Sequence, residues 1–254
     1  MKNVKIPHSI MAKRSVIFVI PKNEENTLAA FCSYKRSATY LVTMSCSAPY
    51  IIWEKIKQYE IEIVKRRCSS SEIAWHKPKV IESDYFYKNG KKMTIKQWDT
   101  YIMNLADDHY REIVLAKVKQ RIVEKGIDGV FLDTVGDIDD YFCNQPVIQE
   151  NFRNAYVTLL KEIKNIDSSL LLVQNWGFET VKSTSLNLIH AVLWEDFNKQ
   201  VIANDEWSQN WMRYFKQQKN KIVTFTVAPD DISKEYSFTN GFISTINPND
   251  IYDK

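Results

Sequence analysis

The ten residues from Gly126 to Val135, Gly-Ile-Asp-Gly-Val-Phe-Leu-Asp-Thr-Val, constrain the fold more than any other part of the chain. They follow an amphipathic segment over 107–125, and Gly126 is the residue type that commonly ends a helix. The short apolar run 130–132 is typical of a strand buried on both faces. Asp133 comes at once after this run, where the chain leaves the sheet. The stretch therefore predicts one α/β unit whose strand ends in a carboxylate.

The same alternation of buried strands and helices runs through most of the chain. Between them, residues 73–106 are the least regular part, with a hairpin turn expected at Asn89-Gly90. Helices are expected at 24–36, from Pro49 onward, and at 107–125, 147–165, 178–187 and 205–218. Strands are expected at 16–20, 39–44, 61–64, 129–132, 170–173, 190–195, 221–227 and 241–246.

Eight buried strands with helices between them predict an α/β fold, a single (β/α)₈ TIM barrel, over residues 15–254. Residues 1–14 would form an N-terminal arm. The chain has 254 residues, close to the roughly 250 that such a barrel typically needs. No linker or repeat marks a second domain.

Composition excludes several classes of protein. The net charge is +3, from 34 basic and 31 acidic residues, and does not call for nucleic acid or an anionic membrane as partner. The four cysteines form no CxxC pair and the four histidines no HExxH or HxH cluster, so neither a metal nor any other cofactor is expected. We expect a monomer.

No apolar run approaches the roughly 18 residues that span a bilayer. The run Val16–Ile20 is too short for the core of a signal peptide. As written, the chain is expected to be cytoplasmic, or exported if a leader has been removed.

The carboxyl ends of barrel strands line one rim, which is where barrel enzymes keep their active sites. Two carboxylates on nearby strand ends are what the cleavage of a glycosidic bond needs. Asp133 and Glu195, at the ends of the fourth and sixth predicted strands, are the candidate catalytic pair. Candidate substrate-binding residues around them are Arg66, Glu72, Asp137, Asn175, Trp176 and Trp194.

Each candidate has a structural alternative. A carboxylate at a strand end is often only a helix cap or a salt-bridge partner, and Asn175 can be a turn residue ahead of Gly177. Trp176 and Trp194 can stack on sugar rings or fill the core. The acidic run from Asp133 to Asp140 invites a calcium site, but it lacks the glycine and the terminal glutamate of an EF-hand loop.

Three segments, in matching order and spacing, resemble one known family. Lys125-Gly126-Ile127-Asp128-Gly129-Val130-Phe131-Leu132-Asp133-Thr134-Val135 resembles the Gly-hydrophobe-Asp-Gly-Val-Phe-Leu-Asp signature of glycoside hydrolase family 114, the endo-α-1,4-polygalactosaminidase-like (β/α)₈ barrels. Val173-Gln174-Asn175-Trp176-Gly177-Phe178-Glu179 is similar to its Gln-Asn-Gly segment. Val192-Leu193-Trp194-Glu195-Asp196-Phe197 looks like its segment with the second acid.

This resemblance, over roughly residues 107–200, implies cleavage of an α-1,4-linked galactosamine-type polysaccharide by Asp133 and Glu195. Glu195 has the more apolar neighbours, so we expect it to be the proton donor and Asp133 to be the nucleophile or an electrostatic partner. The chain departs from the family after the third strand, where only Glu72 matches. Two alternatives stay open: a catalytically weakened homologue that binds a polysaccharide or protein partner through the same rim, and a metal-dependent barrel hydrolase with an ion near Asp133.

Overall fold

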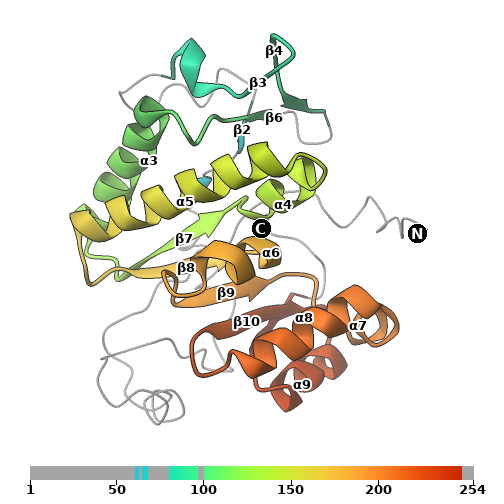
Figure 1. Ribbon diagram of the computed structural model, residues 1–254. Coiled ribbons are helices and arrows are strands. Elements are labelled where there is room, and N and C mark those ends of the chain that lie inside the picture. Colours follow the sequence, from blue (N-terminus) through green and yellow to red (C-terminus); the bar gives the residue numbers. More distant parts are fainter. Residues whose placement is uncertain (1–60, 63–64, 68–79, 97–99, 248–254) are drawn as a thin grey trace.

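The computed structural model describes residues 61–62, 65–67, 80–96 and 100–247 (Figure 1). The expected arm over 1–14, the first two expected strands and the helices expected within 24–60 lie outside the described residues.

The main sheet has six strands, and every neighbouring pair is parallel. The order in the sheet, β1-β7-β8-β9-β10-β11, is the order along the chain. An all-parallel sheet in which each strand pairs with the next is the arrangement of a (β/α) barrel. These strands confirm the third to eighth predicted strands: β1 Ile61–Glu62, β7 Gly129–Asp133, β8 Leu171–Asn175, β9 Ala191–Trp194, β10 Val223–Ala228 and β11 Ile243–Ile246.

The predicted helices that fall in the described residues are present. In Figure 1, α3 and α5 lie on the side of β7, whereas α7, α8 and α9 gather beside β10. The predicted helices are observed as α3 Asp108–Arg121 followed by the 3₁₀ turn Val123–Lys125, α5 Pro146–Ile166, α6 Phe178–Thr180 continued by the π-helical turn Val181–Ser185, and α8 Glu206–Gln217.

Within the described residues, three further α-helices were not predicted: α4 Gly136–Phe142, α7 Lys199–Asn204 and α9 Asp231–Thr239. These helices are short, and several of their apolar side chains face solvent. Their sequences therefore lack a clear pattern of apolar residues on one helix face. Val201 in α7 is 59% exposed and Ile232 in α9 is 66% exposed. Side-chain caps start two of them, since Asn198 accepts from the backbone of Gln200 and Asp230 from that of Ser233.

The irregular segment between β1 and α3 forms small antiparallel sheets. The predicted hairpin is confirmed: β3 Tyr87–Lys88 pairs with β4 Lys91–Lys92, and Asn89 and Gly90 take the positive φ angles that such a turn requires. β6 Thr100–Ile102 pairs with β5 Thr94–Ile95 and with β2 Lys65–Arg67. The candidate Arg66 therefore lies in a short strand that pairs with β6.

A buried carboxylate ties this segment to the barrel. Asp84 is fully buried, accepts from the backbone N–H of Ile81 at 2.7 Å, and lies 2.9 Å from Nδ1 of His109 in α3. Hydrogen bonding to Asp84 is the main reason that the pKa of His109 is raised.

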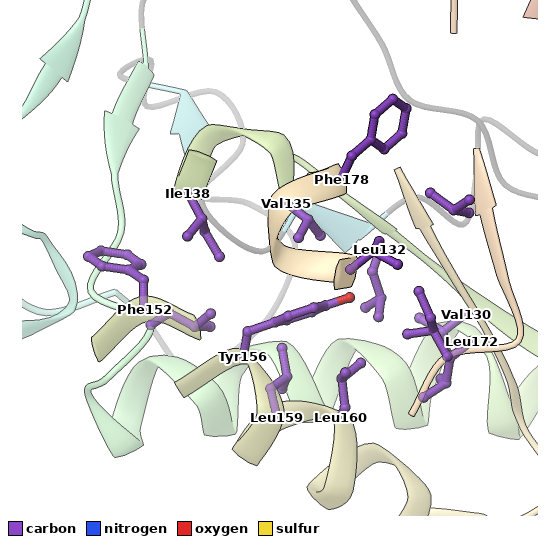
Figure 2. Packing of buried hydrophobic residues seen from close by; sticks show 14 of the residues in the cluster. Val130, Leu132, Val135, Ile138, Phe152, Tyr156, Leu159, Leu160, Leu172 and Phe178 are labelled. Carbon is purple, nitrogen blue, oxygen red and sulfur yellow. The ribbon is translucent and has the colours of Figure 1, made fainter. Parts of the chain in front are cut away.

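The two faces of the main sheet bury different sets of side chains. One face packs against α5, where Val130, Leu132 and Leu172 meet Tyr156 and Leu160 (Figure 2). The opposite face carries a second buried set: Phe131, Val173, Leu193, Phe225 and Val227. Side chains alternate along a strand. Asp133, Asn175 and Glu195 therefore share the second face, each two residues beyond one of its apolar side chains.

We predict that Leu160→Ala lowers the free energy of unfolding by about 2–5 kcal/mol, because Leu160 is 1% exposed beneath the sheet and its loss leaves a cavity. The matched control is Val147→Ala on the same helix, where the side chain is 71% exposed. That change should stay within about 0.5 kcal/mol. Urea denaturation of both variants measures the difference, and equal midpoints would contradict the packing described.

Candidate active site

One side-chain amide joins two carboxyl groups at the rim of the sheet. Asn175, at the end of β8, donates from Nδ2 to Oδ1 of Asp133 at 2.8 Å and to Oε2 of Glu195 at 3.1 Å. Asp133 ends β7 and Glu195 follows β9, so the three side chains come from three adjacent strands. Asp133 is 8% exposed and Asn175 is 5% exposed. The structure thus brings the two predicted acids and Asn175 together.

The bridge limits the separation of the acids. Because a single nitrogen reaches both oxygens, Oδ1 of Asp133 and Oε2 of Glu195 are no more than about 6 Å apart. Retaining glycosidases hold their carboxyl groups about 5–5.5 Å apart, whereas inverting enzymes need about 6.5–9.5 Å to admit a water. The upper bound of about 6 Å between these two oxygens lies closer to the spacing of the retaining class than to that of the inverting class.

Glu195 is the proton-holding member of the pair. Burial of its carboxyl, and secondly the negative charge of Asp133, raise the pKa of Glu195 to about 8. Hydrogen bonds from Asn175 and from the indole of Trp176 favour the charged form and limit the rise. Glu195 as a whole residue is only partly buried. An acid that keeps its proton at neutral pH therefore lies near the protein surface, within reach of a ligand.

The backbone turns in an unusual way directly after each of the three residues. Thr134, Trp176 and Asp196 have φ angles of 62°, 52° and 55°, in the left-handed region that residues other than glycine seldom adopt. Each such residue costs on the order of 1–3 kcal/mol and persists only where its surroundings hold it. Left-handed residues follow three adjacent strands, which indicates that the surrounding structure holds the backbone of this rim in a specific conformation.

Gln174 holds the turn after Asn175 from the opposite face of β8. It is fully buried, and its Nε2 donates to the backbone oxygens of Trp176 at 2.8 Å and Gly177 at 3.0 Å. Its Oε1 accepts from the hydroxyls of Tyr156 at 3.1 Å and Ser185 at 2.7 Å. Both polar atoms of the Gln174 amide group are thus used. The nitrogen holds the turn that follows Asn175, and the oxygen is held by Tyr156 and Ser185.

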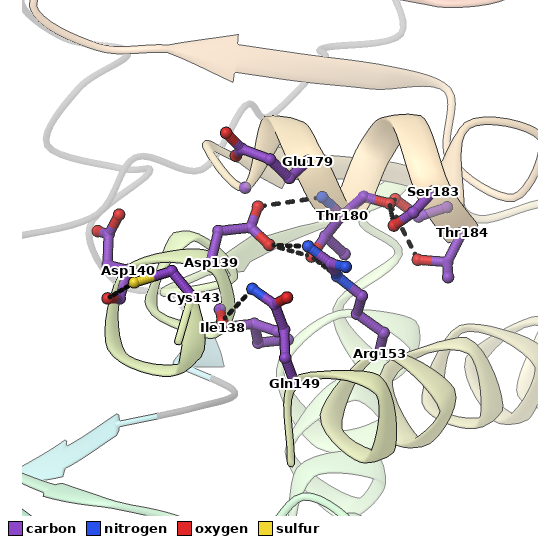
Figure 3. A network of polar contacts seen from close by, with 12 residues as sticks. Ile138, Asp139, Asp140, Cys143, Gln149, Arg153, Glu179, Thr180, Ser183 and Thr184 are labelled. Carbon is purple, nitrogen blue, oxygen red and sulfur yellow. Dashed lines mark hydrogen bonds and ion pairs between the residues drawn. The ribbon is translucent and has the colours of Figure 1, made fainter. Parts of the chain in front are cut away.

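A second buried network fixes the loop after Asp133 against the loop after Asn175 (Figure 3). Asp139 of α4 accepts from Arg153 of α5 at 2.7 Å and from the backbone N–H and hydroxyl of Thr180 at 3.0 and 2.8 Å. Arg153 also donates from Nε to the Thr180 hydroxyl at 3.1 Å. Since α4 follows β7 and α6 follows β8, the hydrogen bonds from Thr180 to Asp139 hold together the two loops beside the acids, and Arg153 ties both residues to α5.

The two loops also touch directly. A Cβ on Gly177, whose φ is +64°, would lie 3.1 Å from a methyl of Val135, and a Cβ on Gly136 would lie 3.1 Å from Cβ of Trp176. Both positions are too close for a larger side chain without a shift of the neighbouring loop.

The remaining predicted residues are placed differently. Trp176 is partly exposed beside Glu195, whereas Trp194 is 2% exposed and faces the helices, because it alternates with Glu195 on β9. Trp194 is therefore a core residue in this structure. Asp137 is 6% exposed in the first turn of α4. Arg66 lies in β2 opposite Tyr101, with its side chain outside the described part, and Glu72 lies outside the described residues.

Sequence reasoning assigned no role to the residues of the two buried networks. Gln174 lay inside a segment that was recognised, and a polar residue within a buried strand is the signal that could have found it. Asp139 was part of an acidic run that suggested only calcium. Arg153, Tyr156 and Thr180 carried no signal, since they meet the loops only through the tertiary fold.

Comparison with known proteins agrees with this geometry. Residues 68–245 match the hypothetical glycosyl hydrolase family 15. The chain belongs to this family. The match covers both candidate acids and Asn175. No curated protein matches the chain in sequence. Family membership supports a glycoside hydrolase and a carbohydrate ligand, while glycoside hydrolase family 114 itself is not confirmed.

Two solved structures share the fold. One is the glycoside hydrolase domain of PelA from Pseudomonas aeruginosa, with a TM-score of 0.54, 15% identity, and coverage of 75% of this chain and 77% of that one. A variant of the same domain gives a TM-score of 0.53 with the same identity and coverage. The PelA domain is TIM-barrel-like. The likeness identifies the fold of this chain.

None of the helices in the described residues combines the length and the apolar character needed to cross a membrane. In the same residues, no group of three or more His, Cys, Asp or Glu side chains is placed to hold a metal ion.

The raised pKa of Glu195 predicts a pH-dependent effect on stability. Between about pH 4.5 and about pH 8 the folded protein holds a proton that the unfolded chain releases, so stability falls as pH rises. Glu195→Gln removes this term. The stability of the variant relative to the native protein should therefore increase across that window, by up to about 1.4 kcal/mol per pH unit. Urea denaturation at several pH values measures it.

The control for this experiment is Glu235→Gln on α9, which removes an exposed carboxyl far from the site. Its stability relative to the native protein should be nearly independent of pH over the same range. A flat difference for Glu195→Gln as well would show that Glu195 is ionised throughout.

Proposed function

We propose that this protein is a glycoside hydrolase that cleaves an α-1,4-linked galactosamine-type polysaccharide, with Asp133 and Glu195 as its two carboxylates. The observation that carries the proposal is the bridge from Asn175 to both acids at the rim. Family membership supports the class of reaction. The class of sugar is supported by the resemblance of segments 125–135, 173–179 and 192–197 to glycoside hydrolase family 114.

The different surroundings of the two acids assign their roles. Glu195, with a pKa of about 8, carries a proton at neutral pH and is the general acid. Asp133, which accepts a hydrogen bond from the same Asn175 nitrogen, is the other acid of the pair and is the nucleophile. A distance of no more than about 6 Å between the two bonded oxygens favours the double displacement of a retaining enzyme.

The reaction then follows in two displacements. Glu195 gives its proton to the glycosidic oxygen while Asp133 attacks the anomeric carbon, so the C–O bond breaks and a glycosyl ester forms on Asp133. Glu195, now a carboxylate, takes a proton from a water that attacks the same carbon. The ester bond breaks, Asp133 regains its charge, and Glu195 is protonated again. Asn175 stabilises the Asp133 carboxylate before the first step and after the second.

We predict that Asp133→Asn and Glu195→Gln each reduce the release of reducing ends from partly deacetylated α-1,4-galactosaminogalactan by about 10²-fold or more. Each variant removes one acid while keeping the size of the side chain. Glu235→Gln is the matched control, because it neutralises an exposed carboxyl on α9, and it should leave the rate unchanged. Circular dichroism should confirm that all three variants are folded.

Full activity in either site variant would contradict the assignment of that residue. If the native protein releases no reducing ends but still binds the polymer, the chain is instead a weakened homologue that binds a polysaccharide through the same rim.

The spacing of the acids also predicts the stereochemistry. Two displacements at one carbon restore its configuration, so the first product from an α-linked polymer should be the α anomer. Proton NMR of the anomeric signals in the first minutes of hydrolysis, before mutarotation, measures this. Initial appearance of the β anomer would indicate inversion, and with it a wider separation of the acids in the bound state.

A further inference from the structure

A platform of aromatic rings extends from the candidate site to the surface. Three rings, those of Trp176, Phe178 and Trp207, lie nearly parallel to one another. The ring centroids of Trp176 and Phe178 are 5.1 Å apart, and the angle between the ring planes is 26°. For Phe178 and Trp207 the centroid distance is 5.8 Å and the angle is 19°. For Trp176 and Trp207 these values are 6.4 Å and 26°. Phe178 is 1% exposed, whereas Trp207, in the first turn of α8, is 44% exposed.

The rings are supported from below, so their exposed surface is rigid. The ring centroids of Trp194 and Phe215 both lie 5.0 Å from that of Phe178, in edge-to-face arrangements. Trp211 packs against Trp207 at 6.2 Å with the planes 66° apart. Rigid aromatic surface binds ligands with little loss of side-chain freedom.

A carboxylate stands at the outer edge of the platform. The indole N–H of Trp207 donates to Oε1 of Glu179 at 3.4 Å, and Glu179 is partly exposed. Burial, followed by the nearby charge of Asp139, raises the pKa of Glu179. A positive group bound at Glu179 would offset this unfavourable accumulation of negative charge.

The platform is continuous with the reacting groups. Trp176 follows Asn175 directly, and its indole lies near enough to Glu195 to favour the charged form of that carboxyl. A sugar ring offers an apolar face of C–H groups that packs on the electron-rich face of an indole. An amino sugar adds an ammonium group, which a carboxylate and an aromatic face both attract.

We propose that Trp176, Trp207 and Glu179 form a second sugar-binding subsite next to the cleavage point, which stacks one amino-sugar residue of the polymer and pairs its ammonium group with Glu179. The choice of an amino sugar rests on the proposed function, whereas the position of the subsite rests on the rings themselves.

Binding to an inactive protein tests the subsite separately from catalysis. The background is Glu195→Gln, and the probes are α-1,4-galactosamine oligosaccharides, either fully deacetylated or fully N-acetylated, in isothermal titration calorimetry. Trp207→Ala in this background should weaken the binding of both probes by about 10-fold, the loss of roughly 1.4 kcal/mol typical of a stacked aromatic contact. Glu179→Gln should weaken the binding of the deacetylated probe alone.

The matched control is Phe238→Ala, which removes an aromatic side chain with the same 44% exposure. Phe238 lies in the last turn of α9, at the opposite end of the sheet from Asp133, and its loss should not change binding. Trp207→Ala binding both probes as tightly as the control would overturn the subsite. Absence of binding of both probes to the Glu195→Gln protein would overturn the amino-sugar ligand.

The two proposals fail in different ways. Loss of binding in Trp207→Ala, together with a native protein that releases no reducing ends, would support the subsite and refute the hydrolase. Hydrolysis by the native protein with unchanged binding in Trp207→Ala would refute the subsite alone.

Discussion

The hydrogen bonds from one amide nitrogen of Asn175 to two carboxyl groups are the contacts on which the rest of the site depends. Two acids this close repel one another when both are charged. Asn175 relieves the repulsion by donating to both, and Glu195 relieves it further by keeping its proton, as its pKa of about 8 indicates. The arrangement requires three adjacent parallel strands in register, because only then do residues 42 and 20 positions apart meet at one nitrogen.

Hydrogen bonds on the opposite face of the sheet stabilise the unfavourable backbone conformation of the turns at the rim. The left-handed turns at Thr134 and Trp176 direct the chain away from the rim at once, and each is unfavourable alone. Gln174 fixes the second turn with two hydrogen bonds, and two more from Tyr156 and Ser185 hold its own side chain in place. The Asp139–Arg153 ion pair joins α4 to α5, and the hydrogen bonds from Thr180 to Asp139 join α4 to α6. A buried ion pair adds little net stability by itself, so its use here is to hold two loops in one position.

Much of the fold could be predicted from the sequence, because strands buried on both faces leave continuous apolar runs such as 130–132. The acids could be placed at the rim because each directly follows such a run. The alternation of side chains along a strand also places Trp194 and Glu195 on opposite faces of the sheet. The partners of Asp139 could not be predicted, because Arg153 and Thr180 reach it only through the packing of three helices. Trp207 lies in no strand and no recognised motif, so only the structure brings it beside Trp176.

Trp176 belongs to both the acid pair and the aromatic platform, because it follows Asn175 directly and its ring packs near that of Trp207. Burial is already the largest cause of the raised pKa of Glu195. In the hydrolase that we propose, a sugar ring stacked on Trp176 would keep further water away from this carboxyl and so act in the same direction. The proposed general acid would then hold its proton most firmly when a glycosidic oxygen is in place to receive it.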